Sequence, residues 1–261
     1  MDGGNKNIRS QKRNRDFVLD EAREALLSGQ PYAYWGLDVI PSVIDGTEVL
    51  FATDKLRDPI QRCHRNGEFY EEEELTRIRE IFPKGGVFVD IGSNIGNHSL
   101  FVAKFLEPQK IIPFEPNPLA YRLLMANIAM NGLRDLFDVS YVGLGLSDKA
   151  QGGFAMTDQK KNLGAAKMVA GEGDLEVVRG DDALRDINPD LLKIDVEGME
   201  IMVLSGLEET IARAKPRILI EVDQANYDAF DAWVEKVGYQ VTDVVQRYRS
   251  NKNFFLEPKS D

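Results

Sequence analysis

The sequence has one cysteine, two histidines and no long apolar run, and each scarcity excludes a class of protein. Because Cys63 has no partner in the chain, it cannot form an internal disulfide, and a reducing, cytoplasmic location is expected. The chain contains no run of about 18 apolar residues, so no membrane-spanning helix is predicted. The basic N-terminal residues are not followed by an apolar stretch, so no secretory signal is predicted either.

Positive charge is also scarce. The chain carries 32 Lys and Arg residues against 43 Asp and Glu residues, which gives a formal net charge of −11. A chain this acidic is not attracted overall to nucleic acid or to an anionic lipid surface, so neither is an expected partner. Residues 1–15 are the exception, and we expect a flexible basic tail there, with Lys6, Arg9, Lys12, Arg13 and Arg15.

The length of 261 residues, with 43% hydrophobic side chains, leaves room for one large globular domain with an extension. After Gly86, short β-branched runs alternate with helical segments. We therefore place the main domain at 83–261 and an N-terminal cover segment at 16–82. The cover is expected to hold helices at 17–29 and 70–82 and a hairpin or extended stretch at 37–61.

The main domain has the rhythm of a parallel sheet with helical crossovers. Strands are predicted at 87–91, 110–115, 139–146, 191–196, 217–222, 239–247 and 253–257, and helices at 96–106, 117–131, 199–213 and 226–237. Continuous apolar strands alternating with helices predict a doubly wound, mostly parallel α/β sheet covered on both faces. The last two strands have no helix between them, which predicts a terminal hairpin with one antiparallel strand. Residues 147–180 are rich in Gly and Lys and predict a β-hairpin insertion over the carboxyl edge of the sheet.

The first motif is VFVDIGSNIGNHSLF at 87–101, in which Asp90 ends a predicted strand. Gly92 lets the chain turn tightly, and Gly96 lets the next helix begin close to a ligand at the edge where such sheets bind nucleotides. Asn94 stands where a dinucleotide-binding turn has its second glycine, which argues against NAD. Asp90 and its surroundings suit a cofactor that carries an amino group, because a carboxylate there could hold the ammonium of a methionine.

The second motif places Glu115 at the end of the next predicted strand, with Asn117 just after it. A carboxylate at this position accepts two hydrogen bonds from a ribose diol, which NAD and S-adenosylmethionine share. Asn117 is expected to touch the adenosine. Asp90 or Glu115 alone could be only a helix cap, but two acids at adjacent strand ends favour a nucleoside site.

The third motif, KIDVEGME at 193–200, delivers Lys193, Asp195 and Glu197 to the same edge of the sheet. Three ionisable groups at alternate positions favour a functional role for Asp195 and Glu197. Glu200 is better explained as an acid in the first turn of a helix, where the helix dipole favours negative charge.

Together these runs resemble the FkbM-type methyltransferases, S-adenosylmethionine-dependent O-methyltransferases with a class I Rossmann-like fold. The resemblance covers roughly residues 65–222 and is carried by DIGSNIGNHSL at 90–100, FEPNP at 114–118, Asn-Leu-Gly at 162–164 and KIDVEGME at 193–200. It implies a Rossmann-like methyltransferase domain over 83–261. Tyr70 and Glu71 lie in a further similar stretch, where they either close over the cofactor or simply begin a helix.

The resemblance also implies roles for single residues. The methionine part of the cofactor would be held by Asp90, Gly92, Asn94 and Gly96, its ribose and adenine by Glu115 and Asn117, and the adenine face by Leu144, Gly145 and Leu146. Asp195 and Glu197 would face the site of methyl transfer. Family members often have a Glu followed by an imidazole after the strand at 217–222, but here Glu221 is followed two residues on by Asp223. If that imidazole is the base elsewhere, this protein must use another group.

The predicted function is therefore S-adenosylmethionine-dependent O-methylation of a hydroxyl on a small-molecule or sugar/polyketide-type acceptor. Aligning the oxygen, carbon and sulfur atoms and removing the hydroxyl proton are the two tasks of such an enzyme. The candidates for the base are Asp195, Glu197, Glu221 and His98. His98 is alternatively a partly buried residue at a helix start, and His64, outside any motif, is expected on the surface or in the cover.

Three alternatives stay open. Asp195, Glu221 and Asp223 could bind Mg²⁺ and so acidify a diol, an arrangement that we do not favour. An NAD-dependent oxidoreductase would explain Glu115 but not Asn94. A non-catalytic nucleoside-binding partner protein would have no need of the acids at the sheet edge. A homo-oligomer is compatible with each of these functions.

Overall fold

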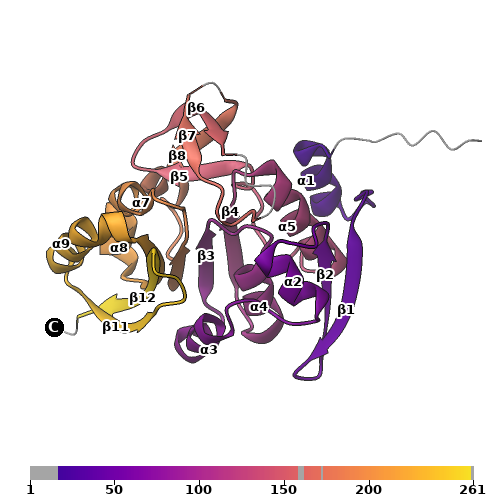
Figure 1. Ribbon diagram of the computed structural model, residues 1–261, viewed down its shortest axis with the longest axis horizontal. Coiled ribbons are helices and arrows are strands. Elements are labelled where there is room, and N and C mark those ends of the chain that lie inside the picture. The colour runs from indigo at the N-terminus through magenta and orange to yellow at the C-terminus, as the bar shows by residue number, and fades with distance from the viewer. Residues whose placement is uncertain (1–16, 158–161, 172, 260–261) are drawn as a thin grey trace, which may run out of the picture.

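The computed structural model describes residues 17–157, 162–171 and 173–259, so the basic tail predicted at 1–15 lies outside the described residues. Its central sheet has the strand order β11-β12-β10-β9-β3-β4 (Figure 1). The bounds are β3 Val87–Ile91, β4 Lys110–Phe114, β9 Leu191–Ile194, β10 Arg217–Asp223, β11 Tyr239–Val245 and β12 Asn251–Pro258. β4, β3, β9 and β10 run parallel, and β12 is antiparallel to β10 and β11. The predicted parallel sheet with one antiparallel strand in a terminal hairpin is confirmed.

Helices cover both faces of the central sheet. Successive strand residues point to opposite faces, so Phe88 and Ile111 belong to one apolar cluster and Val89 and Ile112 to another. The first cluster includes side chains of α3 Glu72–Ile81, α4 Asn97–Phe105 and α5 Pro118–Met130; the second includes side chains of α7 Glu200–Gly206, α8 Glu208–Ala214 and α9 Tyr227–Val237, which follows the 3-10 turn η1 Gln224–Asn226. Burial on both faces explains why the inner strands are continuously apolar. No helix in the described part of the chain is long and apolar enough to cross a bilayer.

The helix predicted at 199–213 is two helices, α7 and α8, which meet at Leu207. Gly206, the last residue of α7, packs against the chain beside β5, where a Cβ atom would lie 2.0 Å from the carbonyl oxygen of Ser147. The break coincides with this close approach between segments far apart in sequence, which local periodicity does not encode.

A second sheet has the strand order β5-β8-β6-β7 and lies at the top of Figure 1. The bounds are β5 Leu144–Ser147, β6 Gln151–Met156, β7 Met168–Ala170 and β8 Leu175–Arg179, with the short helix α6 Gly180–Ala183 after β8. The strand predicted at 139–146 begins only at Leu144. Before it, isolated bridges join Phe137 to Ile111 in β4 and Val142 to Glu115, just after β4. Gly143, with a φ of 95°, turns the chain away from β4. The described residues of 147–180 form three strands rather than a simple hairpin, and β8 pairs in parallel with β5.

The segment before the central sheet contains α1 Leu19–Ser28, β1 Asp38–Ile44, β2 Thr47–Thr53, α2 Pro59–Arg65 and α3. Strands β1 and β2 form an antiparallel hairpin at the right of Figure 1. Helix α2 is not predicted, and it begins inside the stretch expected to be a hairpin or extended. Its signal was present: the Asp58 carboxylate accepts a hydrogen bond from the Gln61 amide, and Pro59 stands at the first helical position.

Asn127 of α5 and Asn131, which caps the end of this helix, form hydrogen bonds with the backbone of β2. Asn127 Oδ1 accepts a hydrogen bond from the Ala52 amide at 2.7 Å, and Asn131 exchanges two hydrogen bonds with the backbone of Leu50. Asn127 Nδ2 also donates to the carbonyl oxygen of Ile95, in the turn after β3, at 2.8 Å. The β1–β2 hairpin is thereby tied both to α5 and to the turn that carries the first motif.

Candidate active site

The loops after β3, β4 and β9, together with Glu221 near the end of β10, line two adjoining cavities at the carboxyl edge of the central sheet. The first cavity lies between the ends of β3 and β4 and the second sheet. The second cavity lies among α2, the residues before α3, the start of α4 and the terminal hairpin. Both cavities are lined by Asn94, Gly164, Asp195 and Glu197, which therefore form a shared wall.

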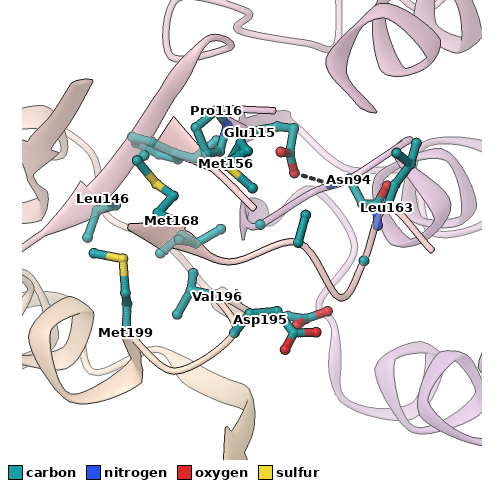
Figure 2. A pocket seen from close by; sticks show the side chains of 17 residues that line it. Asn94, Glu115, Pro116, Leu146, Met156, Leu163, Met168, Asp195, Val196 and Met199 are labelled. Atoms are coloured by element: carbon teal, nitrogen blue, oxygen red, sulfur yellow. Dashed lines mark hydrogen bonds between the residues drawn. The ribbon is translucent and has the colours of Figure 1, made fainter. Parts of the chain in front are cut away.

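Glu115 lies at one end of the first cavity and is only 6% exposed. Its two oxygens accept hydrogen bonds from backbone amides, Oε2 from Asn94 at 2.7 Å and Oε1 from Asn117 at 2.8 Å. Figure 2 shows the bond to Asn94. Burial raises the pKa of Glu115 to about 7, although the two amides oppose that rise. Each oxygen keeps a further lone pair, so the carboxylate can still accept hydrogen bonds from a diol.

The opposite side of the first cavity is apolar. The cavity is lined by the thioethers of Met156, Met168 and Met199; Figure 2 shows Met168 and Met199 on the side of Leu146 and Met156 closer to Pro116. Gly145 adjoins them, and a Cβ atom there would lie 2.9 Å from the sulfur of Met168. Gly145 leaves room there for a flat ring, and the flexible, polarisable thioethers around it can pack against the face of a planar heterocycle.

The turn after β3 is held in a shape that most residues avoid. Gly92 has a φ of 78°, and a Cβ atom there would lie 1.8 Å from the carbonyl oxygen of Asp195. Asn94 also has a positive φ, 51°. A Cβ atom at Gly96 would meet Leu124 at 2.7 Å, so this glycine admits the packing of α5 rather than a ligand.

The buried ammonium of Lys193 lies between the carboxylates of Asp90 and Asp195, next to the shared wall. It donates to the carbonyl oxygen of Gly92 at 2.9 Å and to Asp195 Oδ2 at 3.3 Å, and it lies 3.5 Å from Asp90 Oδ1. Burial by itself lowers the pKa of Lys193, but the carboxylates of Asp195 and Asp90 outweigh it and raise the pKa overall. Asp90 is fully buried, accepts a hydrogen bond from the Ser99 hydroxyl at 2.6 Å, and lines neither cavity.

Three carboxylates converge where the cavities meet. Asp195, Glu197 and Glu221 each offer an oxygen within 4.8 Å of the others. Burial, followed by the charge of Asp195, raises the pKa of Glu197 to about 7 and that of Glu221 to about 9. Asp223, predicted as a metal ligand with Asp195 and Glu221, is not in this cluster: it caps η1 and pairs with Lys167 at 3.4 Å.

The two histidines lie close to the second cavity in different settings. His64, predicted on the surface or in the cover, is fully buried, contacts Asn97 Oδ1 through Nε2 at 3.1 Å and stacks on Phe51. Burial lowers its pKa to about 4. His98 lines the second cavity with its Nε2 atom 3.4 Å from Glu71 Oε2. Burial, with help from nearby cationic side chains, lowers the pKa of His98 well below its usual value.

The structure brings most of the predicted site residues together. The first cavity is lined by Gly92, Asn94, Glu115, Gly145, Leu146, Asp195 and Glu197, and the second also by His98 and Glu221. Asn117 lines neither: its side chain accepts a hydrogen bond from Leu119 as the N-cap of α5. Sequence reasoning missed Met156, Met168, Tyr248 and Asn251, whose positions depend on how the second sheet and terminal hairpin fold back.

A profile described as the methyltransferase FkbM domain matches residues 90–241, which is more than half of the chain and includes the turn after β3, Glu115 and the carboxylate cluster. This chain belongs to the FkbM methyltransferase family. The family that the motifs resembled is thus confirmed, and with it methyltransferase activity and the Rossmann-like fold.

Two curated relatives are named methyltransferases. This FkbM methyltransferase is 28% identical over 198 residues to Methyltransferase sdnD of Sordaria araneosa, which covers 61% of the chain and 76% of that relative. It is 27% identical over 189 residues to Methyltransferase 1 of Beauveria bassiana, covering 61% of the chain and 74% of the relative. The crystal structure of Methyltransferase FkbM from Methylobacillus flagellatus is similar over 72% of the chain and 46% of that protein, with a TM-score of 0.51 and 17% identity, a likeness of fold alone.

Proposed function

We propose that this FkbM methyltransferase transfers the methyl group of S-adenosylmethionine to a hydroxyl of a small-molecule or sugar/polyketide-type acceptor. The observation that supports the proposal most is the shared wall. One cavity offers a buried carboxylate and an apolar slot, the other offers acids and an imidazole, and Asp195 and Glu197 belong to both. That arrangement suits a reaction in which two ligands meet end to end.

The residues of the first cavity fit S-adenosylmethionine. Glu115 would accept hydrogen bonds from the ribose diol, and the slot beside Gly145 and Leu146 would hold the adenine ring. The turn at Gly92 and Asn94 would hold the methionine end, with Asp90 acting indirectly because it already pairs with Lys193. When bound, S-adenosylmethionine supplies an electrophilic methyl group. The chain's own contribution is to orient that group toward the second cavity and to exclude water.

The second cavity would receive the acceptor. Asp195, Glu197, Glu221 and His98 remain the candidates for orienting the hydroxyl and taking its proton. We assign the N-terminal cover at 30–65 and the excursion at 150–171 to shaping this pocket, because residues of α2 and Gly164 line it. A cytoplasmic location and a homo-oligomeric state stay predictions.

Mg²⁺ is the main alternative way to orient an acceptor diol. Three carboxylate oxygens within 4.8 Å of one another suit a hard cation. The Lys193 ammonium, 3.3 Å from Asp195 Oδ2, already supplies positive charge to the cluster, and this opposes a second cation. We therefore favour a reaction without Mg²⁺. The oxidoreductase is disfavoured by Asn94, and a non-catalytic partner protein by the acids of the second cavity.

The proposal is tested by mixing the protein with S-adenosylmethionine carrying a ¹³C-labelled methyl group and a panel of sugars, polyketide-type alcohols, amines and carboxylic acids. We expect calorimetry to detect S-adenosylhomocysteine binding and ¹³C NMR to find the label in a new methyl ether. Label on nitrogen or carbon would overturn O-methylation. Binding of NADH in place of S-adenosylhomocysteine would favour an oxidoreductase, and tight binding without transfer would favour the partner protein.

A further inference from the structure

The imidazole of His98 lines the second cavity. Its Nε2 atom is buried and has no hydrogen-bond partner among the described residues, and the residue is 5% exposed. The nearest carboxylate is that of Glu71, 3.4 Å away, which is longer than a hydrogen bond. Catalytic hydrogen bonds are often long before ligands bind and tighten afterwards. Both residues line the second cavity, and neither lines the first, so they belong to the acceptor's side of the shared wall.

Glu71 is held in an unfavourable backbone conformation. It precedes α3 with a φ of 62° and a ψ of 51°, and its side chain does not cap the helix. Asn97 fixes the chain just before it, because its side chain accepts from the Tyr70 amide at 2.9 Å and donates to the Tyr70 carbonyl oxygen at 2.8 Å. Such strain persists only where the surroundings impose it, and it is concentrated at functional sites. Asn97 thus sets Glu71 beside His98, its own neighbour in α4.

The other carboxylates of the second cavity have partners or face both cavities. Asp195 accepts a hydrogen bond from Lys193, and Glu221 Oε1 accepts one from Asn251 at 2.6 Å. Glu197 lines the first cavity as well as the second. Glu71 and His98 are the carboxylate and the imidazole that remain on the acceptor's side.

We infer that His98 is the base that accepts the proton of the acceptor hydroxyl and that Glu71 is its positioning residue, an inference that rests on the proposed O-methylation. With Nε2 turned toward Glu71, Nδ1 is the nitrogen left for the acceptor. As the oxygen–carbon bond forms and the carbon–sulfur bond breaks with its electron pair passing to sulfur, the hydroxyl proton passes to the imidazole. The Glu71 carboxylate fixes the ring and stabilises the imidazolium. In this chain the imidazole comes from α4, whereas the family resemblance implied an imidazole after the strand at 217–222.

The test uses the full chain with ¹⁵N-labelled histidine, saturated with S-adenosylhomocysteine, and needs no acceptor. Only two imidazoles contribute signals, and His64 serves as the internal reference. We expect the His98 signals of the wild type to report the Nε2–H tautomer and to shift as Glu71 titrates, since burial and the charge of Asp195 raise the pKa of Glu71 to about 8. The other ionisable groups around the pair are Tyr70, Glu74, Lys193, Glu221 and Arg247.

Glu71→Gln should abolish that shift of the His98 signals and leave those of His64 in place, whereas Glu72→Gln, an exposed neighbour in α3, should leave both unchanged. Identical His98 spectra in the wild type and Glu71→Gln would overturn the pairing. With an acceptor from the labelled panel, His98→Asn should lower kcat about 10²–10⁴-fold and leave the affinity for S-adenosylhomocysteine within twofold. An unchanged kcat would overturn the base. Failure of the proposed function itself would be distinguishable, because the wild type would then either not bind S-adenosylhomocysteine or transfer no labelled methyl group to an oxygen, whatever the His98 signals show.

Discussion

Replacing Glu115 with Gln is the sharpest perturbation of the first cavity, because it keeps the shape of the side chain. Both carboxylate oxygens already accept a backbone amide, at 2.7 and 2.8 Å. Glutamine offers one oxygen, so its NH₂ group must face either the Asn94 or the Asn117 amide, and one ribose hydroxyl loses an ionised acceptor. A hydrogen bond to a charged group contributes about 1.5–3 kcal/mol. Since 1.4 kcal/mol is tenfold, S-adenosylhomocysteine should bind roughly 10- to 100-fold more weakly.

The assay is isothermal titration calorimetry with S-adenosylhomocysteine across pH 6 to 8.5. Burial raises the pKa of Glu115 to about 7. Ribose hydroxyls donate to the ionised carboxylate, so wild-type affinity should rise as the pH passes through 7, and the Glu115→Gln affinity should lack that rise. Glu235→Gln, at an exposed position on α9, is the matched control. A Glu115→Gln protein that unfolds at the wild-type temperature and binds within twofold of wild type would refute the ribose contact.

Three further outcomes are expected. Gly92→Ala should unfold at lower denaturant concentration and lose S-adenosylhomocysteine binding. The added Cβ would lie 1.8 Å from the Asp195 carbonyl oxygen, and the positive φ at this position costs about 1–3 kcal/mol for a residue with a side chain. An unchanged unfolding midpoint would contradict the tight turn. Lys193→Met leaves two carboxylates without their cation and should destabilise the fold by about 3–5 kcal/mol in urea titrations, whereas a loss below 1 kcal/mol would mean that the ammonium is dispensable. EDTA should leave the unfolding temperature and methyl transfer unchanged, and a Mg²⁺-dependent rise in either, absent in Glu221→Gln, would establish a metal at Asp195, Glu197 and Glu221.

The sequence predicts those parts of the fold that depend on patterns among neighbouring residues. Continuous apolar runs identify β3, β4, β9 and β10, because burial on both faces leaves few polar positions. Local patterns do not predict the helix break at Leu207, which accompanies the contact of Gly206 with Ser147. Nor do they predict that the chain turns at Gly143 and leaves β4 for a second sheet. Both departures depend on contacts between segments far apart in sequence.

The candidate site divides in the same way. Glu115 and Asp195 follow strands, and the sequence alone predicts that they share one sheet edge, since parallel strands bring their carboxyl ends together. Glu71 was recognised only through a family resemblance, because neither its positive φ nor its approach to His98 leaves a mark in the sequence. Asn117 follows a strand as Glu115 does, but its side chain caps a helix instead.

The asparagine side chains beside β2 limit how this chain can be re-engineered. A hairpin joined to a helix by Asn127 and Asn131 is not a free module, because a graft of β1–β2 from a relative would lose its hydrogen-bonding edge unless α5 came with it. Asn127 also donates a hydrogen bond to Ile95 in the turn after β3, so a poorly matched graft would disturb the proposed cofactor site as well. The positions free to vary are on the outward side of β1, where Val43 is 75% exposed. Diversification of this hairpin is expected there rather than along β2.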